Sequence, residues 1–330
     1  MNNLLSYPNH TTILHHQKGI LKDGLFFIDA NHKYLAIVDK KVYDLHHYLF
    51  DNLPNNVLIY PFVAKESNKS IDEYTKIIDF LLINKFNRTD EIIAIGGGIT
   101  TDLALYVAST YKRGIKITLI PTTLLAMVDA SIGGKCGINH NDFKNQIGTF
   151  YLPNQLIIDE SFLDTLPNDE FNNGFSEIIK YAIIKDEEMF LSIEENKYQI
   201  NQLIERCIKI KVNIVNEDLY DNNIRKILNF GHTYGHMVES HSKYQISHGH
   251  SVAIGMVKEL VDENLKNKVM KILQTKFDLN YQLTKNDIRK YLAQDKKMEK
   301  DTIDVVHIDK IGHAKVIKKK VEDLIDEYIW

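Results

Sequence analysis

Short runs of aliphatic and β-branched residues alternate with stretches of helical spacing in the first half of the chain. Buried strands are predicted over residues 34–38, 56–60, 91–95, 116–120 and 155–158. Apolar residues spaced three and four apart predict a helix over 70–86. A second helix is predicted over 100–111, with a threonine cap and Asp102 in its first turn. This alternation is typical of an α/β domain built on a parallel sheet with crossover helices.

Helical periodicity dominates the chain after about residue 163. Helices are predicted over 170–185, 198–215, 224–240 and 252–273, and a short β-pair, 302–307 with 313–317, precedes a last helix over 321–328. We therefore expect an α/β domain over residues 1–161 and a mostly α-helical domain over 162–330. A chain of 330 residues is long enough for two such domains.

Composition narrows the classes of partner. The net charge is −4, and no basic stretch carries interleaved aromatic residues, so we expect no nucleic acid partner. The two cysteines, Cys136 and Cys207, have neither metal-ligand spacing nor the density of a disulfide framework, which fits a reducing compartment. No signal peptide is recognised at the N-terminus, and the longest apolar stretch, 115–127, is too short to span a membrane and contains Pro121. A cytoplasmic protein with a small-molecule substrate is expected.

Three consecutive glycines, Gly96, Gly97 and Gly98, lie between a predicted strand and a predicted helix. Glycines there let backbone N–H groups approach phosphate oxygens at the positive end of the helix. The full G-x-G-x-x-G pattern is not met, because position 101 is threonine and no acidic residue follows about 20 residues later. A tight turn without a ligand is the alternative. Asp39 ends a neighbouring strand, where it can bind a ribose hydroxyl or serve as a cap.

The segment 131–145 combines adjacent glycines with Lys135, Lys144 and Asn145, and it follows Asp129 closely. A glycine-rich loop with two lysines suits the binding of an anion. A solvated surface loop is the alternative.

Histidines cluster between residues 232 and 248. His232 and His236 are four residues apart, so they share one face of a helix, and His248 follows after a short connection. Histidine is a common zinc ligand, and a catalytic zinc site uses about three protein ligands. A hydrogen-bonded pair of core histidines is the alternative. A carboxylate would complete the set, and Glu177 on the helix over 170–185 is a candidate.

Other polar residues follow the same helical faces. Lys180 lies three residues after Glu177, and Asn229 and Arg225 lie one and two turns before His232 on the helix predicted over 224–240. A cation, an amide and imidazoles are then expected on one side of the helix, an alignment that packing alone does not explain.

Seven segments, taken in order, resemble the 3-dehydroquinate synthase family. They read IAIGGGITTDL, YKRG, IPTTLLAMVDASIGGKCGINH, FKNQIGTFYLP, FSEIIKYAIIKD, LNFGHTYGH and HGHSVAIGM, and the resemblance extends from about residue 39 to residue 317. It implies an N-terminal Rossmann-like NAD domain, a helical C-terminal domain and a homodimer. The implied activity converts 3-deoxy-D-arabino-heptulosonate 7-phosphate to 3-dehydroquinate and phosphate, the second step of the shikimate pathway.

The resemblance also implies roles for individual residues. NAD would contact Asp39, Glu66, Lys69, Gly97, Gly98, Asp102, Thr122, Thr123, Lys135, Lys144, Phe162 and Thr165. Zinc or cobalt would be held by Glu177, His232 and His248, so that His236 moves from the metal to the substrate phosphate. Substrate would meet Asp129, Lys135, Asn145, Lys180, Lys211, Arg225, Asn229, His236 and Lys297, with Arg113 reaching the site of the neighbouring subunit.

The implied reaction is a carbon–oxygen lyase reaction in which NAD is used and regenerated. The metal acidifies vicinal hydroxyls, NAD takes a hydride from C5, phosphate leaves, the hydride returns, and the opened ring closes by an intramolecular aldol step. Two related enzymes are the alternatives: another sugar-phosphate cyclase, such as a 2-deoxy-scyllo-inosose synthase, and a metal-dependent polyol dehydrogenase. A cofactor-binding protein without catalysis is a third.

The chain departs from the family's pattern at a few positions. Thr101 stands where the family prefers glycine, Cys136 where it prefers threonine, and Phe143 where it often has glycine. His250 replaces the usual glutamate of an HGE triplet, where it is placed to act on the metal through His248. The stretch after Met256 is shorter than usual. None of these changes removes an expected ligand.

Overall fold

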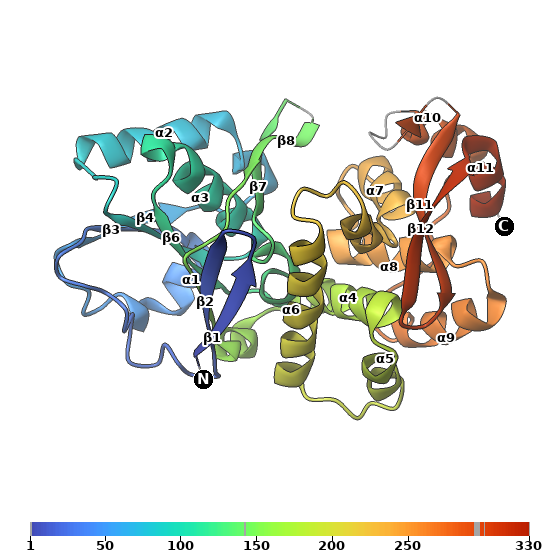
Figure 1. Ribbon diagram of the computed structural model, residues 1–330, viewed down its shortest axis with the longest axis horizontal. Coiled ribbons are helices and arrows are strands. Elements are labelled where there is room, and N and C mark those ends of the chain that lie inside the picture. The colour runs from blue at the N-terminus through green and yellow to red at the C-terminus, as the bar shows by residue number, and fades with distance from the viewer. Residues whose placement is uncertain (1, 142, 294–297, 300, 330) are drawn as a thin grey trace. The chain divides into compact units, whose positions relative to one another are not determined.

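A computed structural model describes residues 2–141, 143–293, 298–299 and 301–329. The chain divides into two compact units, Met1–Phe171 and Asn172–Trp330. The first is an α/β unit and the second is mostly helical, as the sequence predicts (Figure 1). No helix among the described residues is long and apolar enough to cross a membrane.

A seven-stranded sheet forms the centre of the first unit. Its order is β1 (Asn2–Tyr7), β2 (His10–His16), β9 (Gln155–Ile158), β6 (Lys116–Pro121), β5 (Glu91–Gly96), β3 (Tyr34–Asp39) and β4 (Val57–Phe62). All neighbouring strands are parallel except β1 and β2, which form an antiparallel hairpin at one edge. The five predicted strands are confirmed. The sheet is therefore mixed and not wholly parallel. The β1–β2 hairpin was not predicted, because these two strands hold too many polar residues to be recognised in the sequence.

Helices and turns connect these strands. They are α1 (Lys40–Leu45), η1 (His47–Leu49), η2 (Glu66–Asn68), α2 (Ile71–Ile83), α3 (Gly98–Thr110), η3 (Tyr111–Arg113), η4 (Ala126–Ala130) and η5 (Glu160–Thr165). The prediction of a threonine cap for α3 is wrong. The helix begins at Gly98 with Gly97 as its cap residue, and Asp102 follows its first turn.

The segment predicted as a glycine-rich loop is largely a two-stranded ribbon. Strands β7 (Lys135–His140) and β8 (Phe143–Phe150) pair antiparallel. Glycine-rich strands carry a weak periodic signal because several positions have no side chain to alternate. At Gly137 an added Cβ would lie 2.7 Å from the Ile147 carbonyl oxygen, so the two strands approach closely there.

The second unit is built from helices and a small sheet. Its helices are α4 (Asn168–Lys185, which begins in the first unit), α5 (Glu187–Glu194), α6 (Ile200–Glu217), η6 (Ile224–Asn229), α7 (His232–His241), α8 (His248–Glu259), α9 (Glu263–Leu273), α10 (Lys285–Leu292) and α11 (Val321–Ile329). Strands β10 (Met298–Glu299), β11 (Thr302–Lys310) and β12 (His313–Lys320) form the sheet. The β-pair and the last helix are thus confirmed.

Two predicted helices are each two elements. The helix predicted over 224–240 is interrupted at Gly231, whose φ of +76° no helix tolerates. The helix predicted over 252–273 ends at Glu259, and α9 starts anew after Asp262, whose side chain accepts a hydrogen bond from the Leu265 backbone. Apolar periodicity continues across both breaks, so it does not reveal them.

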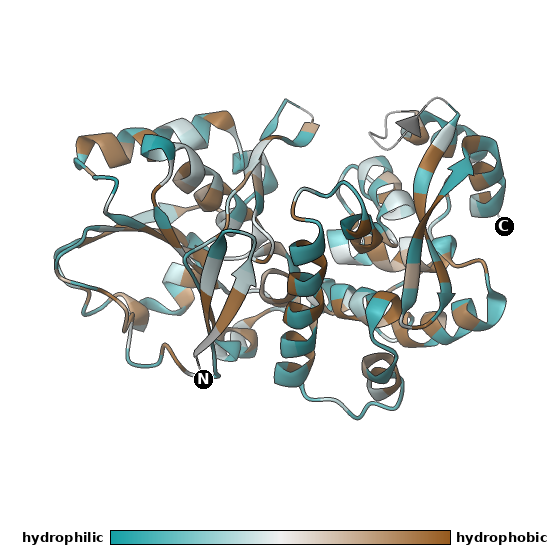
Figure 2. Ribbon diagram, in the orientation of Figure 1, coloured by the Kyte–Doolittle hydropathy of each residue, from teal (hydrophilic) through white to brown (hydrophobic). Residues whose placement is uncertain are grey.

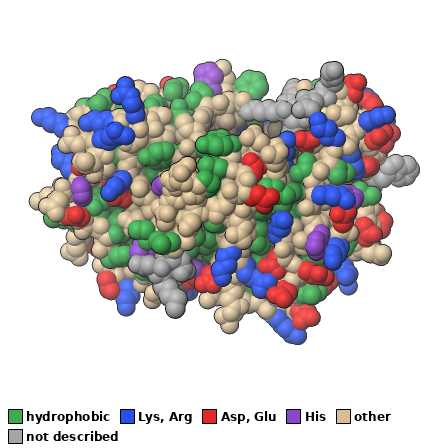
Figure 3. All heavy atoms as spheres, in the orientation of Figure 1, with side chains coloured by type: hydrophobic (Ala, Val, Ile, Leu, Met, Phe, Trp, Pro, Cys, Tyr) green, Lys and Arg blue, Asp and Glu red, His purple; other side chains and the backbone are tan. Residues whose placement is uncertain are grey.

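The cores follow the apolar faces of these elements, and Figure 2 shows hydrophobic and hydrophilic bands alternating along α6. In the second unit, Tyr234 and Val238 of α7 pack with Leu324 and Tyr328 of α11, all at most 2% exposed. On the face shown in Figure 3, lysine and arginine side chains lie among aspartate and glutamate side chains and form no continuous basic band.

Candidate active site

The strand order of the first unit reverses between β3 and β5. Strand β4 lies on one side of β3, and β5, β6 and β9 follow in turn on the other side. Asp39 ends β3 and Gly96 ends β5, in register because Val38 pairs with Ile95. Such a reversal opens a crevice at the carboxyl ends of the strands, a usual place for ligands of parallel sheets.

The glycine turn lies at this reversal. Gly97 has no side-chain cap, so the first N–H groups of α3 are not covered by a capping side chain. An added Cβ on Gly97 would lie 3.0 Å from the Thr123 Cγ2, and one on Gly98 would lie 3.3 Å from the Ala130 Cβ. Thr101, where the related family prefers glycine, directs its hydroxyl to the Gly98 carbonyl oxygen at 3.1 Å, so it leaves the turn unobstructed.

Lys69 is a buried cation beside this turn. Its side chain is 4% exposed, and its Nζ donates to Asp102 Oδ2 at 2.9 Å and to Asn145 Oδ1 at 2.6 Å. Burial opposes the charged form, but the carboxylates of Asp102 and Glu66 raise the pKa of Lys69 above its ordinary value. The network therefore joins α3, η2 and the β7–β8 ribbon.

The other expected cofactor residues lie at the ends of further elements of this unit. Thr122 donates its N–H to the Gly96 carbonyl oxygen at 3.0 Å, and Thr123 starts the next turn. The Thr165 hydroxyl lies 2.9 Å from His46 Nε2, and the His46 ring packs edge-on against Phe162 with ring centroids 4.9 Å apart. Sequence reasoning missed His46, because a lone histidine after a short helix carries no signal.

Several residues expected to contact the substrate or NAD are spread over four elements of the first unit. Asp129 belongs to η4, Lys135 and Lys144 belong to the two strands of the ribbon, and Arg113 ends η3 with a positive φ of +64°. Arg113, Lys135 and Asn145 are exposed and Lys144 is half-buried. Of this set, Asn145 is bound to Lys69.

Cys136, which stands where the related family prefers threonine, is buried in the β7–β8 ribbon. Its Sγ lies 3.2 Å from Thr149 Oγ1, and burial raises the pKa of the thiol to about 11. Because the thiolate is the reactive species, iodoacetamide at pH 8 should modify Cys136 at least about 100-fold more slowly in the native protein than in guanidinium. Peptide mass spectrometry measures both rates, and equal rates would contradict the buried thiol.

Three ligand atoms converge in the second unit. Glu177 of α4 is 1% exposed, and its Oε1 lies 3.6 Å from His232 Nε2 and 3.7 Å from His248 Nε2. Lys180, one turn later, pairs with Oε2. Two ligands at about 2.0–2.2 Å from a tetrahedral zinc lie roughly 3.4 Å apart, so this spacing suits one divalent ion. Glu177, His232 and His248 thus form a group that can hold a metal.

The two histidines differ in their protonation. Burial, helped by Lys180, lowers the pKa of His232 well below its ordinary value, so its Nε2 lone pair is free at neutral pH. Burial also opposes the charged form of His248, but hydrogen bonds with Glu177 and Glu239 raise its pKa to about 9. A metal that binds His248 therefore displaces a proton.

His236 lies on the same face as His232, with ring centroids 5.3 Å apart, and it is exposed. The start of this helix is held by Glu259 of α8, which sequence reasoning missed. Its carboxylate accepts from the backbone N–H groups of Gly231 at 2.7 Å and Tyr234 at 3.0 Å. A carboxylate at a helix N-terminus satisfies groups that would lack partners and fixes the position of His232.

Arg225 and Asn229 lie on η6 and not on the helix of His232, contrary to the prediction of one continuous face. Arg225 is 3% exposed; its backbone N–H donates to Asp218 Oδ2 at 3.1 Å and its Nη1 donates to the Leu219 carbonyl oxygen at 2.6 Å. Lys211 of α6 is 6% exposed. Asp218, which anchors the turn before Arg225, was not predicted.

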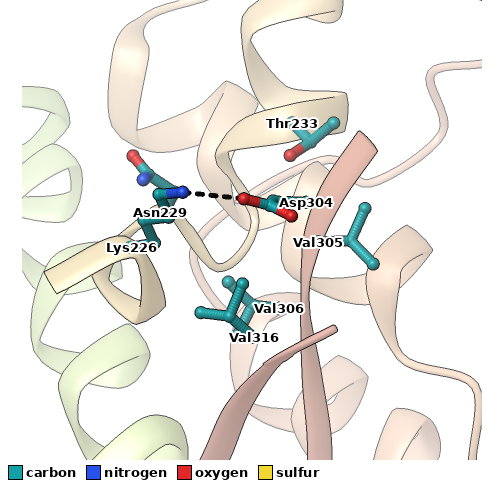
Figure 4. Close-up of a pocket in the computed structure, with 7 residues that line it drawn as sticks. All are labelled: Lys226, Asn229, Thr233, Asp304, Val305, Val306 and Val316. Atoms are coloured by element: carbon teal, nitrogen blue, oxygen red, sulfur yellow. Dashed lines mark hydrogen bonds and ion pairs between the residues drawn. The ribbon is translucent and has the colours of Figure 1, made fainter. Parts of the chain in front are cut away.

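A small pocket lies beside Asn229 (Figure 4). Thr233, Val305 and Val316 help to line it, and an ion pair of 2.7 Å between Lys226 Nζ and Asp304 Oδ2 joins η6 to β11. The ion pair thus connects the segment that carries Arg225 and Asn229 to the small sheet.

Two remaining expectations concern residues at the edge of the site. His250 does not act on His248: its Nε2 bonds to the Asp278 carbonyl oxygen, and its ring packs on Phe277 with centroids 5.2 Å apart. Lys297, expected at the substrate with its neighbours Asp295 and Lys296, lies outside the described residues.

Comparison with known proteins gives a consistent result. Residues 59–173 match the model of the 3-dehydroquinate synthase N-terminal family, and residues 174–298 match that of the C-terminal family. A 3-dehydroquinate synthase of Clostridium tetani is 37% identical over 296 residues, which cover 84% of this chain and 79% of that protein.

Two solved structures share the fold. A 2-deoxy-scyllo-inosose synthase complexed with carbaglucose-6-phosphate, NAD+ and Co2+ has a TM-score of 0.87 and 24% identity, over 100% of this chain and 99% of the other. A 2-epi-5-epi-valiolone synthase from Streptomyces hygroscopicus subsp. jinggangensis, with NAD+ and Zn2+ bound, has a TM-score of 0.86 and 25% identity, over 98% and 95%.

Proposed function

The chain belongs to the 3-dehydroquinate synthase family and has that activity in the shikimate pathway, and we propose that it works with NAD and one zinc or cobalt ion. The observation that carries the metal is the convergence of two imidazole Nε2 atoms on one oxygen of Glu177. A carboxylate with two histidines is a usual protein ligand set for a catalytic zinc, which keeps a position open for substrate. The valiolone synthase with the same fold binds zinc.

NAD fits the reversal of the sheet in the first unit. The uncapped N-terminus of α3 at Gly97 and Gly98 suits a pyrophosphate, and Asp39 at the end of the neighbouring strand suits a ribose hydroxyl. Glu66, Lys69, Asp102, Thr122, Thr123, Lys135, Lys144, Phe162 and Thr165 complete the proposed set. When bound, NAD supplies a reversible hydride acceptor and the metal supplies a Lewis acid toward the substrate hydroxyls.

The side chains of the protein would bind and orient the substrate. Arg225 and Lys211 would hold the carboxylate, with the Arg225 backbone held by Asp218 and its planar guanidinium held by the Leu219 carbonyl oxygen. Lys135, Asn145 and His236 would hold the phosphate, together with Arg113 of a neighbouring copy in a homodimer. Asp129, Lys180, Asn229 and Lys297 would contact the ring and its hydroxyls. Catalysis of this kind depends on positioning and on fixed charges.

Phosphate release tests the activity directly. Purified protein with NAD, zinc and 3-deoxy-D-arabino-heptulosonate 7-phosphate should release phosphate without net accumulation of NADH. A steady rise of NADH would instead indicate a polyol dehydrogenase, and absence of phosphate would contradict the function. Another sugar-phosphate cyclase would turn over a sugar phosphate that lacks a carboxylate. This protein should not turn over such a substrate.

The cofactor site gives a separate prediction. Lys69→Met removes the cation that Asp102 and Asn145 share, so NAD should bind about 10- to 100-fold more weakly, as expected for loss of charged hydrogen bonds. Isothermal titration calorimetry measures the Kd. Lys76→Met is the matched control, because Lys76 is an exposed lysine paired with Glu73 away from the glycine turn. Equal NAD affinity of the Lys69 variant and the parent would remove Lys69 from the site.

A further inference from the structure

Both histidines of the metal group turn their Nδ1 atoms away from Glu177. His232 Nδ1 lies 3.0 Å from the Phe230 carbonyl oxygen, and His248 Nδ1 lies 3.3 Å from Glu239 Oε2. A carbonyl oxygen and a carboxylate only accept hydrogen bonds, so each Nδ1 is the donor. Each Nε2 is then left to face Oε1 of Glu177.

Glu239 belongs to the same helix as His232 and acts on the first residue of the next helix. It lies seven residues after His232, two turns along one face of α7, and it is 8% exposed. Helices α7 and α8 pack closely where Gly235 meets Ser251, since an added Cβ on Gly235 would lie 2.9 Å from the Ser251 carbonyl oxygen. The packing of the two helices therefore holds the Glu239 carboxylate against His248.

We propose that Glu239 is a positioning residue that fixes the ring orientation and tautomer of His248 for metal binding. This inference rests on the proposed metal site. A carboxylate that accepts from the other ring nitrogen of a ligating histidine orients the ring and strengthens the ligand. Position 250 cannot take this role, because His250 is bonded to the Asp278 carbonyl oxygen. Among the described residues, Glu239 is thus the carboxylate that lies at Nδ1 of His248, while Glu177 lies at its Nε2.

Direct coordination by Glu239 is the competing possibility. His236, Glu239 and His248 also offer ligand atoms within 4.8 Å of one another. Glu239 lies at the Nδ1 side of the His248 ring, however, whereas Glu177 lies at the Nε2 side. A single ion at Glu177 and His248 Nε2 therefore has the imidazole ring between itself and Glu239, and His236 is the exposed member of that second set.

Zinc affinity of the full chain, freed of metal by a chelator, tests the inference without recourse to activity. Competition with a chromophoric chelator should show that Glu239→Ala binds zinc about 10- to 100-fold more weakly than the parent. Glu239→Gln keeps an oxygen acceptor and should lose less zinc affinity than Glu239→Ala. Glu177→Gln should lose most of its affinity, and the control His250→Ala should stay within about twofold of the parent. Melting temperatures of the metal-free variants report on folding.

Cobalt gives a second readout that a purely structural role would not produce. At saturating Co2+, the visible absorption of Glu239→Ala should keep the parent's band position, because the ligands are unchanged. If both Glu239 variants bind zinc as tightly as the parent protein, the proposal is overturned. If the alanine variant does not fold, the zinc affinity of Glu239→Gln decides the test. A loss in Glu239→Gln as large as in Glu177→Gln, with a shifted cobalt band, makes Glu239 a ligand and also overturns it. Unchanged zinc affinity in Glu177→Gln contradicts the metal site itself, and the role of Glu239 with it.

Discussion

Replacing His232 with alanine is expected to lower kcat/KM for phosphate release by about 10³-fold or more. The change removes one of the two imidazoles that converge on Glu177, and a metal acting as a Lewis acid contributes several kcal/mol to a transition state. The measurement is steady-state phosphate release at saturating NAD, with added zinc and after treatment with a chelator. The parent should lose its activity in chelator and recover it with zinc or cobalt.

A second histidine of the same helix provides the control for this experiment. His241 ends α7, and its Nδ1 contacts the Tyr281 hydroxyl at 2.6 Å, away from Glu177. His241→Ala should keep activity within about twofold of the parent, as for most substitutions away from a site. If the His232 variant retained activity that survives the chelator, the metal would bind elsewhere or would not take part.

Arg225→Lys is expected to lower kcat/KM by about 10²-fold or more. Lysine keeps the positive charge, but it cannot form two parallel hydrogen bonds to a carboxylate, and a buried, hydrogen-bonded charge pair is worth about 2–5 kcal/mol when it is broken. Arg225 is fixed by contacts at both its backbone and its guanidinium, which should keep the loss specific to the substrate. Steady-state kinetics with the heptulosonate phosphate measure the effect.

The matched control is Arg206→Lys. Arg206 pairs with Asp186 and Glu188 with its side chain 39% exposed, so its replacement should leave kcat/KM within about twofold of the parent. Normal turnover by the Arg225 variant would show that this guanidinium does not bind the carboxylate. It would also reopen the alternative of a cyclase whose substrate lacks that group.

The strands and most helices could be predicted from the sequence because their burial is periodic. The strand Gln155–Ile158 has its predicted bounds, and the bounds of the other four predicted strands differ from the observed ones by at most two residues. The breaks at Gly231 and after Glu259 could not be predicted, because apolar periodicity continues across both of them. Glu259 accepts from the start of a helix that precedes it by more than twenty residues, and no local pattern reports such a partner.

In the candidate site too, some residues could be predicted from local spacing and others could not. His232, His236 and Glu177 carry their own signals, since their spacing defines helical faces. His248 begins a different helix, and its approach to Glu177 follows from tertiary packing, so spacing alone favoured His236 as the second ligand. Family resemblance supplied His248, and geometry supplied Glu239. A glutamate two turns after His232 was the available signal for Glu239, but many solvated glutamates share that spacing.

Product analysis by mass spectrometry tests the central claim most directly. The protein is incubated with 3-deoxy-D-arabino-heptulosonate 7-phosphate, catalytic NAD and a defined metal, zinc or cobalt. The predicted product is a carbocycle with the mass of the substrate minus phosphoric acid and the chromatographic behaviour of 3-dehydroquinate, formed in amounts that exceed NAD. An oxidised sugar phosphate formed in step with NADH, or no change in the substrate, would contradict the function assigned to this chain.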